Sequence, residues 1–264
     1  MKKLFLFSLL AIFLIPVTFS QENRYLVFDF IKVETGQTVD FLEYKEFLNK
    51  VYQQAANNGD IAGWDFWSLQ NGSNNEDFQY AAITYFNDPV AMMNGLSNEK
   101  FVEIAKEAYP DMDEQQITEK IRQSLTIRDL AVRSYMVEIA ATNEDVEIKP
   151  GMLASFDLMK AAEGRFDEYE TAEREVFLPL HEKKIDAGFM ESWSLLRTAF
   201  PAGSEAKSTH MTLNIYANYM QFFNSLEYED NTTPIVQDAV EKGLSSRDQK
   251  WIYLATVESV VRRQ

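Results

Sequence analysis

The sequence predicts an α+β fold in which one structural unit is used twice. The segment FDFIKV at residues 28–33 recurs as FDLMKA at residues 156–161, and the same order of strand-like and helix-like segments follows both. A Trp-Ser-Leu sequence then begins at Trp67 in the first half and at Trp193 in the second. Similar segments that keep their order along a chain indicate an internal repeat.

Each copy is predicted to contain strand, helix, strand, strand, helix and strand in that order. In the first copy, β-branched and aromatic runs and apolar residues at helical spacing predict these elements. Pro89 can open the second helical region, which Gly95 and Pro110 interrupt. The predicted strands are residues 25–33, 64–69, 78–86 and 128–141, and the predicted helical regions are residues 39–55 and 89–125.

The second copy repeats this βαββαβ order, and its first helix is aligned by pairing Tyr169 with Tyr44. Such a unit is ferredoxin-like, with both helices on one face of an antiparallel sheet. Each sheet then has one bare face, so we expect two tandem ferredoxin-like repeats packed sheet to sheet as an intramolecular α/β barrel. The predicted divisions are a signal peptide at residues 1–20, a first repeat at 21–141, a linker at 142–150 and a second repeat at 151–264.

The first twenty residues have the pattern of a secretory signal. Lys2 and Lys3 precede an apolar stretch that ends at Pro16, and short residues follow up to Ser20. The sequence therefore predicts a secreted or periplasmic protein, with an uncleaved anchor as the alternative. The chain has no cysteine, which excludes lipidation at a thiol, disulfides and thiolate metal sites.

The formal net charge of −16 argues against two classes of partner. Such a surface repels nucleic acid and anionic membranes, and the clustered basic residues that bind phosphate are missing from the sequence. Glycine-rich phosphate loops, His-Glu-x-x-His helices and Gly-x-Ser-x-Gly elbows are also missing. We therefore expect a small-molecule ligand, no nucleic acid, no membrane after signal cleavage, and a possible homo-oligomer.

In element order and duplication the chain resembles the dimeric α/β-barrel superfamily. The resemblance includes the stretch from Phe177 through His181 and Gly188 to Trp193. This superfamily contains stress-responsive barrel proteins, antibiotic-biosynthesis monooxygenases, muconolactone isomerases, chlorite dismutases and dye-decolourising peroxidases. The resemblance implies an architecture rather than a particular activity, because one fold supports many functions.

Alternation along the strands sorts the side chains into two rows, since successive residues point to opposite faces of a sheet. The more apolar rows, which contain Phe28 and Phe156, are predicted to pack beneath the helices. Asp29 and Asp157 are then expected to enter the space between the two sheets. The same reasoning places His210, Thr212 and Asn214 in that space, and an alignment of the last strands adds Glu138 and Glu258.

Carboxylates enclosed together raise each other's pKa, so one of them could act as an acid or a base near neutral pH. With His210 they could also bind a metal ion. The alternative is that they lie in water at strand ends or pair with Arg128 and Arg133. The candidate catalytic residues are Asp157, Glu258 and His210, and the candidate ligand-binding residues are Asp29, Glu138, Trp67, Trp193, Thr212 and Asn214.

Two aromatic positions and one histidine carry further alternatives. Trp67 and Trp193 could line a ligand cavity or belong to the core. His181 is a candidate haem ligand, or a surface or helix-capping residue. The leading hypothesis is a barrel that binds a small, partly apolar ligand between the repeats without a cofactor. The alternatives are a cofactor-independent isomerase or monooxygenase, and a haem-binding barrel that uses His181 or His210.

Overall fold

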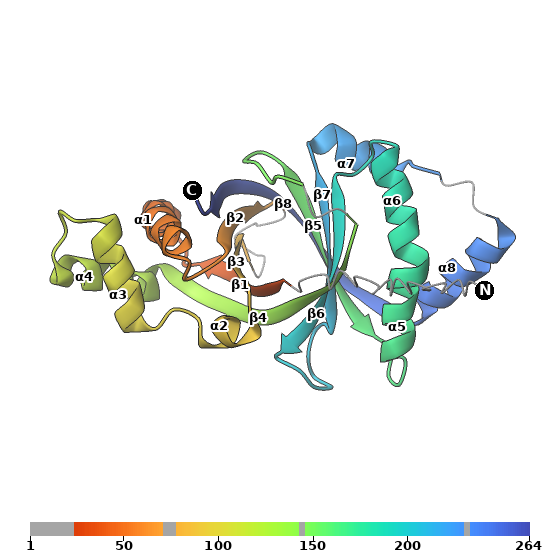
Figure 1. Ribbon diagram of the computed structural model, residues 1–264, viewed down its shortest axis with the longest axis horizontal. Helices are drawn as coiled ribbons and strands as arrows, with labels where there is room; N and C mark the ends of the chain where they lie inside the picture. The colour runs from red at the N-terminus through yellow and green to blue at the C-terminus, as the bar shows by residue number, and fades with distance from the viewer. Residues whose placement is uncertain (1–23, 71–77, 143–145, 230–232) are drawn as a thin grey trace, which may run out of the picture.

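The computed structural model of this 264-residue chain describes residues 24–70, 78–142, 146–229 and 233–264 (Figure 1). The predicted signal peptide at residues 1–20 lies outside the described residues, and so does the turn that the turn-forming residues Asn71, Gly72 and Ser73 predict between the second and third strands. Within the described ranges, no helix is both long and apolar enough to cross a membrane.

The first repeat runs from β1 to β4 and contains four helices among its described residues. Its long helix α1 ends at Gly59, whose φ of 81° is a left-handed conformation that glycine adopts without strain. The predicted second helical region divides into three short helices, because Asp88, Ser97 and Asp113 each cap a new N-terminus. The elements are β1 (Tyr25–Val33), α1 (Thr38–Asn58), β2 (Gly63–Leu69), β3 (Tyr80–Phe86), α2 (Pro89–Asn94), α3 (Asn98–Ala108), α4 (Glu114–Ile127) and β4 (Arg128–Ala141).

The second repeat runs from β5 to β8 and differs mainly in its helices. Its first helix is interrupted by a π-helical turn, η1, and nothing equivalent to α3 lies between α7 and α8 in its described residues. The elements are β5 (Leu153–Ala161), α5 (Phe166–Ala172), η1 (Glu173–Phe177), α6 (Leu178–Asp186), β6 (Ser192–Phe200), β7 (His210–Tyr216), α7 (Tyr219–Leu226), α8 (Pro234–Ser245) and β8 (Arg247–Arg262).

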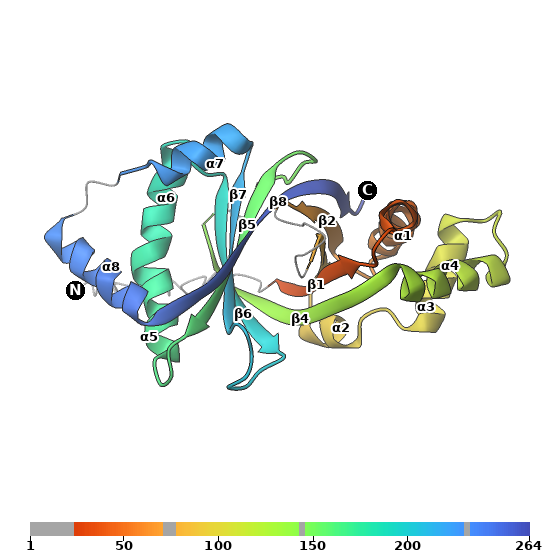
Figure 2. The ribbon, with the colours of Figure 1, turned by 180° about the vertical axis from the view of Figure 1, so that it is seen from behind.

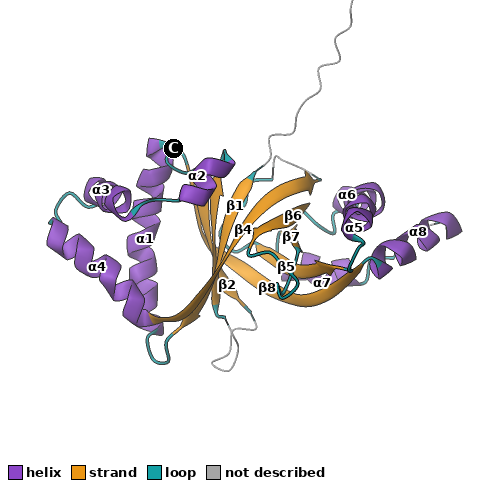
Figure 3. Cartoon of the chain, turned by 90° about the horizontal axis from the view of Figure 1, so that it is seen from below, coloured by secondary structure: helices purple, strands orange, loops and turns teal. Residues whose placement is uncertain are grey.

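The strands form one closed barrel in the order β1-β3-β2-β8-β5-β7-β6-β4. Each repeat supplies four neighbouring strands, and the pairs β2–β8 and β4–β6 join the two sheets at their edges. The helices of each repeat lie outside the barrel on opposite sides of it, and the long strands β4 and β8 run between the two halves (Figures 2 and 3). The predicted α+β barrel of two ferredoxin-like repeats is therefore confirmed.

The middle of the barrel interior is a packed apolar core. Phe28 of β1 meets Phe156 of β5 edge to face with 5.7 Å between ring centroids, and Trp67 meets the same Phe156 ring at 5.5 Å. All three side chains are fully buried. Side chains from both repeats thus fill the middle of the barrel, as they do in other small barrels, so the space around Phe156 is not open to the predicted ligand.

The predicted orientation of the strand rows is also wrong. The apolar row of Phe28 and Phe156 faces the barrel interior, whereas Asp29 and Asp157 face the helices. The prediction that successive side chains alternate between the two faces is correct. The more apolar row, however, is not the one that the helices cover. A barrel encloses its interior on all sides and needs the driest row there, while helices leave parts of the outer face open to polar groups.

The helices of the two repeats align differently from the sequence prediction. Gly36 and Gly164 precede the first helix of each repeat with φ values of 82° and 73°, and Gly59 and Gly188 end it at 81° and 79°. The segment between these glycines is one residue longer in the second repeat. The π-turn η1 accommodates that residue, because a π-helical turn contains one residue more than an α-helical turn.

This alignment corrects two predicted pairings. Trp193 is equivalent to Trp64 rather than to Trp67, since Trp64 lies opposite Thr84 on β3 and Trp193 lies opposite Asn214 on β7. His181 is equivalent to Tyr52, and each stacks on the tryptophan of its own repeat, with centroid distances of 5.0 and 4.9 Å. In the same alignment Tyr169 is equivalent to Phe41 rather than to Tyr44.

The sequence prediction aligns β4 and β8, the last strands of the two repeats, one residue out of register. Phe28 lies opposite Ser134, and its equivalent Phe156 lies opposite Tyr253. The predicted match of Glu138 with Glu258 would instead align Ser134 with Leu254. A slip of one residue moves every side chain of a strand to the other face.

Glu138 and Glu258 consequently lie on different faces. Glu138 is 7 % exposed and lies at one end of the barrel interior. Glu258 points to the helices of the first repeat, where its Oε2 is 4.0 Å from Nζ of Lys45. Of the four predicted interior carboxylates, only Glu138 faces the space between the sheets.

Candidate functional site

A cavity of about 580 Å³ lies between the sheet of the first repeat and its helices α1, α3 and α4. This volume is typical of sites for small organic molecules. Aromatic side chains from the sheet and from the helices form much of its wall. They are Phe41, Tyr44, Tyr52, Trp64, Phe66 and Phe101.

Ring stacking holds these walls in place. Tyr52 of α1 lies parallel to Trp64 of β2, with 4.9 Å between centroids and an interplanar angle of 5°. Tyr80 of β3 stacks against Phe41 of α1 at 5.1 Å and against Phe66 of β2 at 5.2 Å. Rings held by such contacts form a pre-arranged surface, so a flat ligand could bind with little loss of side-chain freedom.

An ion pair closes one side of the cavity. Both carboxylate oxygens of Asp29 accept hydrogen bonds of 2.8 Å from Arg133. These hydrogen bonds to the Asp29 carboxylate raise the pKa of Arg133 above its usual range. Both oxygens of Asp29 are therefore engaged by Arg133, which makes Asp29 a poor candidate for proton transfer.

Arg128 is a second cation at the cavity wall. Its Nε donates to the carbonyl oxygen of Ser124 at 3.2 Å. Across the residues that the structure describes, no carboxylate forms an ion pair with it. Burial raises the pKa of Tyr44 and of Tyr52, against the opposing effect of the Arg128 charge, so both hydroxyl groups remain protonated.

The second repeat has buried polar side chains at the equivalent place. Asp157 is equivalent to Asp29, Arg247 to Arg128 and Glu173 to Lys45. The Nε of Arg247 lies 3.5 Å from Oε1 of Glu173, whose side chain is only 3 % exposed. Burial raises the pKa of Glu173 to about 7 and that of Asp157 to about 6, in both cases against the charge of Arg247.

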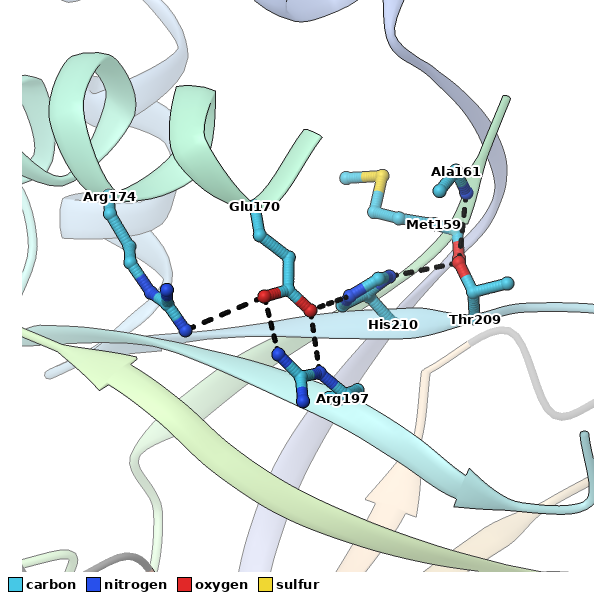
Figure 4. Close-up of polar contacts among 7 residues, drawn as sticks. All are labelled: Met159, Ala161, Glu170, Arg174, Arg197, Thr209 and His210. Atoms are coloured by element: carbon cyan, nitrogen blue, oxygen red, sulfur yellow. Dashed lines mark hydrogen bonds and ion pairs between the residues drawn. The ribbon is translucent and has the colours of Figure 1, made fainter. Parts of the chain in front are cut away.

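A separate polar network joins α5 to the strands of the second repeat (Figure 4). Glu170 is 5 % exposed and accepts two hydrogen bonds from Arg197, at 2.6 and 2.5 Å. Nε2 of His210 lies 3.1 Å from the same carboxylate, and Arg174 lies 3.5 Å from it. Burial alone would raise the pKa of Glu170, but the hydrogen bonds from Arg197 and His210 outweigh burial and lower it.

The ionised Glu170 determines the state of His210. Nε2 must carry a proton to donate to the carboxylate, so Nδ1 accepts a hydrogen bond from the Thr209 hydroxyl at 2.9 Å. Burial lowers the pKa of His210, which keeps the ring neutral. His210 is fully buried between Phe166 and Tyr169, with centroid distances of 4.7 Å. The network thus anchors a helix to the sheet and presents no exposed base.

The histidines do not fit a haem site. His181 stacks on Trp193 with an interplanar angle of 16°, and burial lowers its pKa to about 3. His210 is already bound to Glu170 and Thr209. No histidine, cysteine or methionine is among the residues that line the first-repeat cavity. No group of described residues could hold a metal ion through three or more His, Cys, Asp or Glu side chains.

The predicted catalytic residues do not form one site. Asp157 contacts Asn214, whose Nδ2 is 3.3 Å from Oδ2 of Asp157 and 2.9 Å from Oγ of Ser155. His210 belongs to the Glu170 network. Glu258, although it is on β8 of the second repeat, points to the first repeat near Lys45. Thr212 and Asn214 line the helix-facing side of β7, buried among the second repeat's polar groups.

Other predicted ligand-binding residues are also separated. Trp67 is in the packed barrel interior, and Trp193 stacks on His181 beneath α6. Glu138 and Trp193 line a smaller cavity of about 270 Å³ at the barrel end, together with Arg24 and Arg262. Of the predicted residues, only Asp29 lines the first-repeat cavity.

Sequence reasoning missed most of that cavity. The aromatic residues of α1 were recognised as a helical pattern, and Arg128 and Arg133 only as possible partners for the carboxylates. One available signal was the extra helical region in the first copy, at residues 89–125. Its helices α3 and α4 extend the layer over the sheet and complete the cavity wall.

Comparisons with known proteins identify the fold. No protein-family model matches the chain, and no curated protein is similar to it in sequence. Similar solved structures include an anthrone oxidase-like protein, with a TM-score of 0.61 and 10% identity over 92% of this chain and 94% of that one. Putative monooxygenases from Lactobacillus acidophilus and Fusobacterium nucleatum have TM-scores of 0.58 and 0.54 and identities of 9% and 12%. They cover 92% and 91% of this chain, and 97% and 94% of their own.

Proposed function

Since the chain has the dimeric α/β-barrel fold of these structures, we propose that it binds a small, largely apolar and aromatic ligand in its first repeat. The observation that carries this proposal is the cavity of about 580 Å³ beneath α1, α3 and α4. A core that served only stability would close such a space, because unfilled volume costs packing energy.

The composition of the cavity wall supports an aromatic ligand. Its rings are held by stacking, and a few charged groups, among them Asp29, Arg128 and Arg133, also line it. Ligand sites commonly combine a mainly apolar lining with a few polar groups that orient the ligand. The hypothesis of a partly apolar ligand is thus retained, with its site moved from the barrel interior to the helix side of one repeat.

Titration with naphthalene-based probes would test the proposal. Trp64 lies in the wall, so a bound aromatic ring should change its fluorescence, and calorimetry should show one saturable site. Ala82→Trp would fill the cavity from β3 and should abolish binding. Val132→Trp is the matched control, because Val132 is 38 % exposed and does not line the cavity.

The outcomes separate a real site from surface adsorption. Binding that Ala82→Trp abolishes and Val132→Trp preserves supports the proposal. Absence of saturable binding to any probe, or equal binding by both variants when thermal unfolding shows both to be folded, would overturn it.

A second candidate function is a cofactor-independent monooxygenase. The structures described as putative monooxygenases and as anthrone oxidase-like favour it by analogy of fold. Proton transfer by Asp157, Glu258 and His210 has no support in the geometry, because these residues lie apart. Oxygen uptake that requires an aromatic substrate, and that Ala82→Trp abolishes, would establish this activity in the first-repeat cavity.

We also propose export and allow for self-association. The leader-like residues 1–20 support export, which intact-mass measurement of protein from the periplasm or medium would test by showing cleavage near Ser20. Sedimentation analysis would show whether the exported chain is a monomer or a homo-oligomer.

A further inference from the structure

The two repeats place an arginine at the same point of the fold. Arg128 begins β4 and lies opposite Val33 of β1, and Arg247 begins β8 and lies opposite Ala161 of β5. Each follows the last helix of its repeat and faces the space between helices and sheet. The surroundings of one arginine therefore show what the other lacks.

In the second repeat the chain itself supplies a carboxylate to this arginine. Glu173 projects from the π-turn η1, is 2 % exposed as a whole residue, and has Oε1 3.5 Å from Nε of Arg247. A buried guanidinium is costly without a counter-ion, so a carboxylate at this point balances its charge.

In the first repeat that carboxylate is replaced by a cation. Lys45 stands where Glu173 stands in the second repeat, and it turns to Glu46 at 2.8 Å and toward Glu258. Asp29, the acidic residue among those that line the cavity, has both oxygens bound to Arg133. Arg128 is left at the wall of an aromatic cavity without an ion-pair partner among the described residues.

We infer that the ligand of the first-repeat cavity is an aromatic carboxylate, whose carboxylate group binds Arg128 as Glu173 binds Arg247. Its ring system lies among the aromatic side chains, and its acidic group replaces the internal counter-ion that this repeat lacks. The inference rests on the proposed function, since it specifies the chemistry of the molecule in that cavity.

The inference predicts a preference between two probes of the same shape. We expect wild-type protein to bind 2-naphthoate about tenfold or more tightly than the neutral 2-naphthamide, because a charge-assisted bond to arginine of about 1.4 kcal/mol corresponds to a factor of ten. Calorimetric titration of both probes at neutral pH measures the preference directly.

Three variants show whether Arg128 is responsible. Arg128→Gln should bind both probes with equal affinity while retaining the amide affinity of the wild type. Arg122→Gln is the matched control, since Arg122 lines the same cavity but pairs with Glu119 at 3.2 Å, and it should keep the preference. Lys45→Glu restores the counter-ion at the position of Glu173 and should also abolish the preference, which provides a second test if Arg128→Gln does not fold.

The outcomes distinguish this inference from the proposed function. If neither probe binds to wild-type protein, the proposed function fails and the inference fails with it. If both probes bind equally, the cavity is a ligand site, but the inference that its ligand carries a carboxylate is wrong. A preference that survives in Arg128→Gln, or that Arg122→Gln also removes, would overturn the assignment to Arg128.

Discussion

The two repeats share one backbone plan but use the space between helices and sheet in opposite ways. In the first repeat aromatic rings stand around a cavity, with Asp29 bound to Arg133 at its edge. In the second repeat the corresponding space contains buried polar groups, among them Glu173 and Arg247. The barrel interior between them is apolar and serves both halves.

Because of this difference, the two repeats should respond differently to amino-acid substitutions. In the first repeat, the cavity lowers the packing energy of the core but leaves room for the proposed ligand. A buried polar network contributes little net stability but becomes costly when one member is removed, because its partners lose their counter-charge. We therefore expect function to depend on the first repeat and single charge deletions to be most damaging in the second.

The largest effect is expected for Glu170→Ala. This change removes the acceptor of two bonds from Arg197 and of one from His210, and it leaves His210 buried without that partner. We expect the free energy of unfolding to fall by about 2–3 kcal/mol. This is less than the roughly 3–5 kcal/mol for breaking a fully buried ion pair, because Arg197 is 43% exposed and can be rehydrated. Chemical denaturation measures the loss.

The equivalent position in the first repeat provides the control. Leu42 is 37 % exposed, so Leu42→Ala should cost less than about 1 kcal/mol. Equal losses for the two variants would contradict the view that the second repeat depends on its polar network. Ligand binding in the first repeat should be unchanged in Glu170→Ala, provided that measurements are made well below its unfolding temperature.

The repeated unit could be predicted from sequence because strand and helix periodicity are local properties. The orientation of the strand rows could not, since both rows of β1 and β5 contain apolar residues and the barrel decides which row is enclosed. Phe28 and Phe156 meet in the interior only because strands of both repeats surround them. Such closure depends on the pairs β2–β8 and β4–β6, which join residues far apart in the chain.

The candidate site was harder to predict because small errors of alignment reverse faces. The Trp-Ser-Leu similarity paired Trp67 with Trp193, although Trp67 is inside the barrel and Trp193 faces the helices. The single extra residue in η1 and the register of β8 are not visible as local patterns. The cavity depends on α3 and α4 lying over α1, a tertiary arrangement that strand alternation does not report.

A smaller effect is expected where α8 packs on η1. A Cβ on Gly243 would lie 2.8 Å from Cε2 of Phe177 and 3.1 Å from Cβ of Ala172. Gly243→Ala should therefore destabilise the protein by about 1–2 kcal/mol through overpacking, even though alanine favours a helix over glycine by about 1 kcal/mol.

Ser124 is equivalent to Gly243 in α4 and already carries a Cβ. Ser124→Ala should change stability by less than about 1 kcal/mol, because it removes only a hydroxyl that bonds the carbonyl of Ile121. Thermal unfolding compares the pair. A stabilised Gly243→Ala would show that the helices around η1 can separate and that α8 is not closely packed against Phe177 and Ala172.

The smallest effects are expected for the equivalent aspartates, and they should have opposite signs. Asp29→Asn weakens a bidentate bond to the half-exposed Arg133 and should cost about 0.5–1 kcal/mol at neutral pH. Asp157→Asn removes a charge that burial disfavours and should stabilise by on the order of 1 kcal/mol at pH 7.

The sign of the Asp157 effect should depend on pH in a defined window. The pKa of Asp157 is raised to about 6 in the folded protein from about 4 in the unfolded chain, so the native state binds the proton more tightly. Its contribution to stability is complete below about pH 4 and is lost as pH rises through about 6. The advantage of Asp157→Asn over wild type should therefore be largest at pH 7 and disappear toward pH 4. Denaturation of both proteins across this range measures it, and a difference that does not vary with pH would mean that Asp157 is not buried as a charge among the helices of the second repeat.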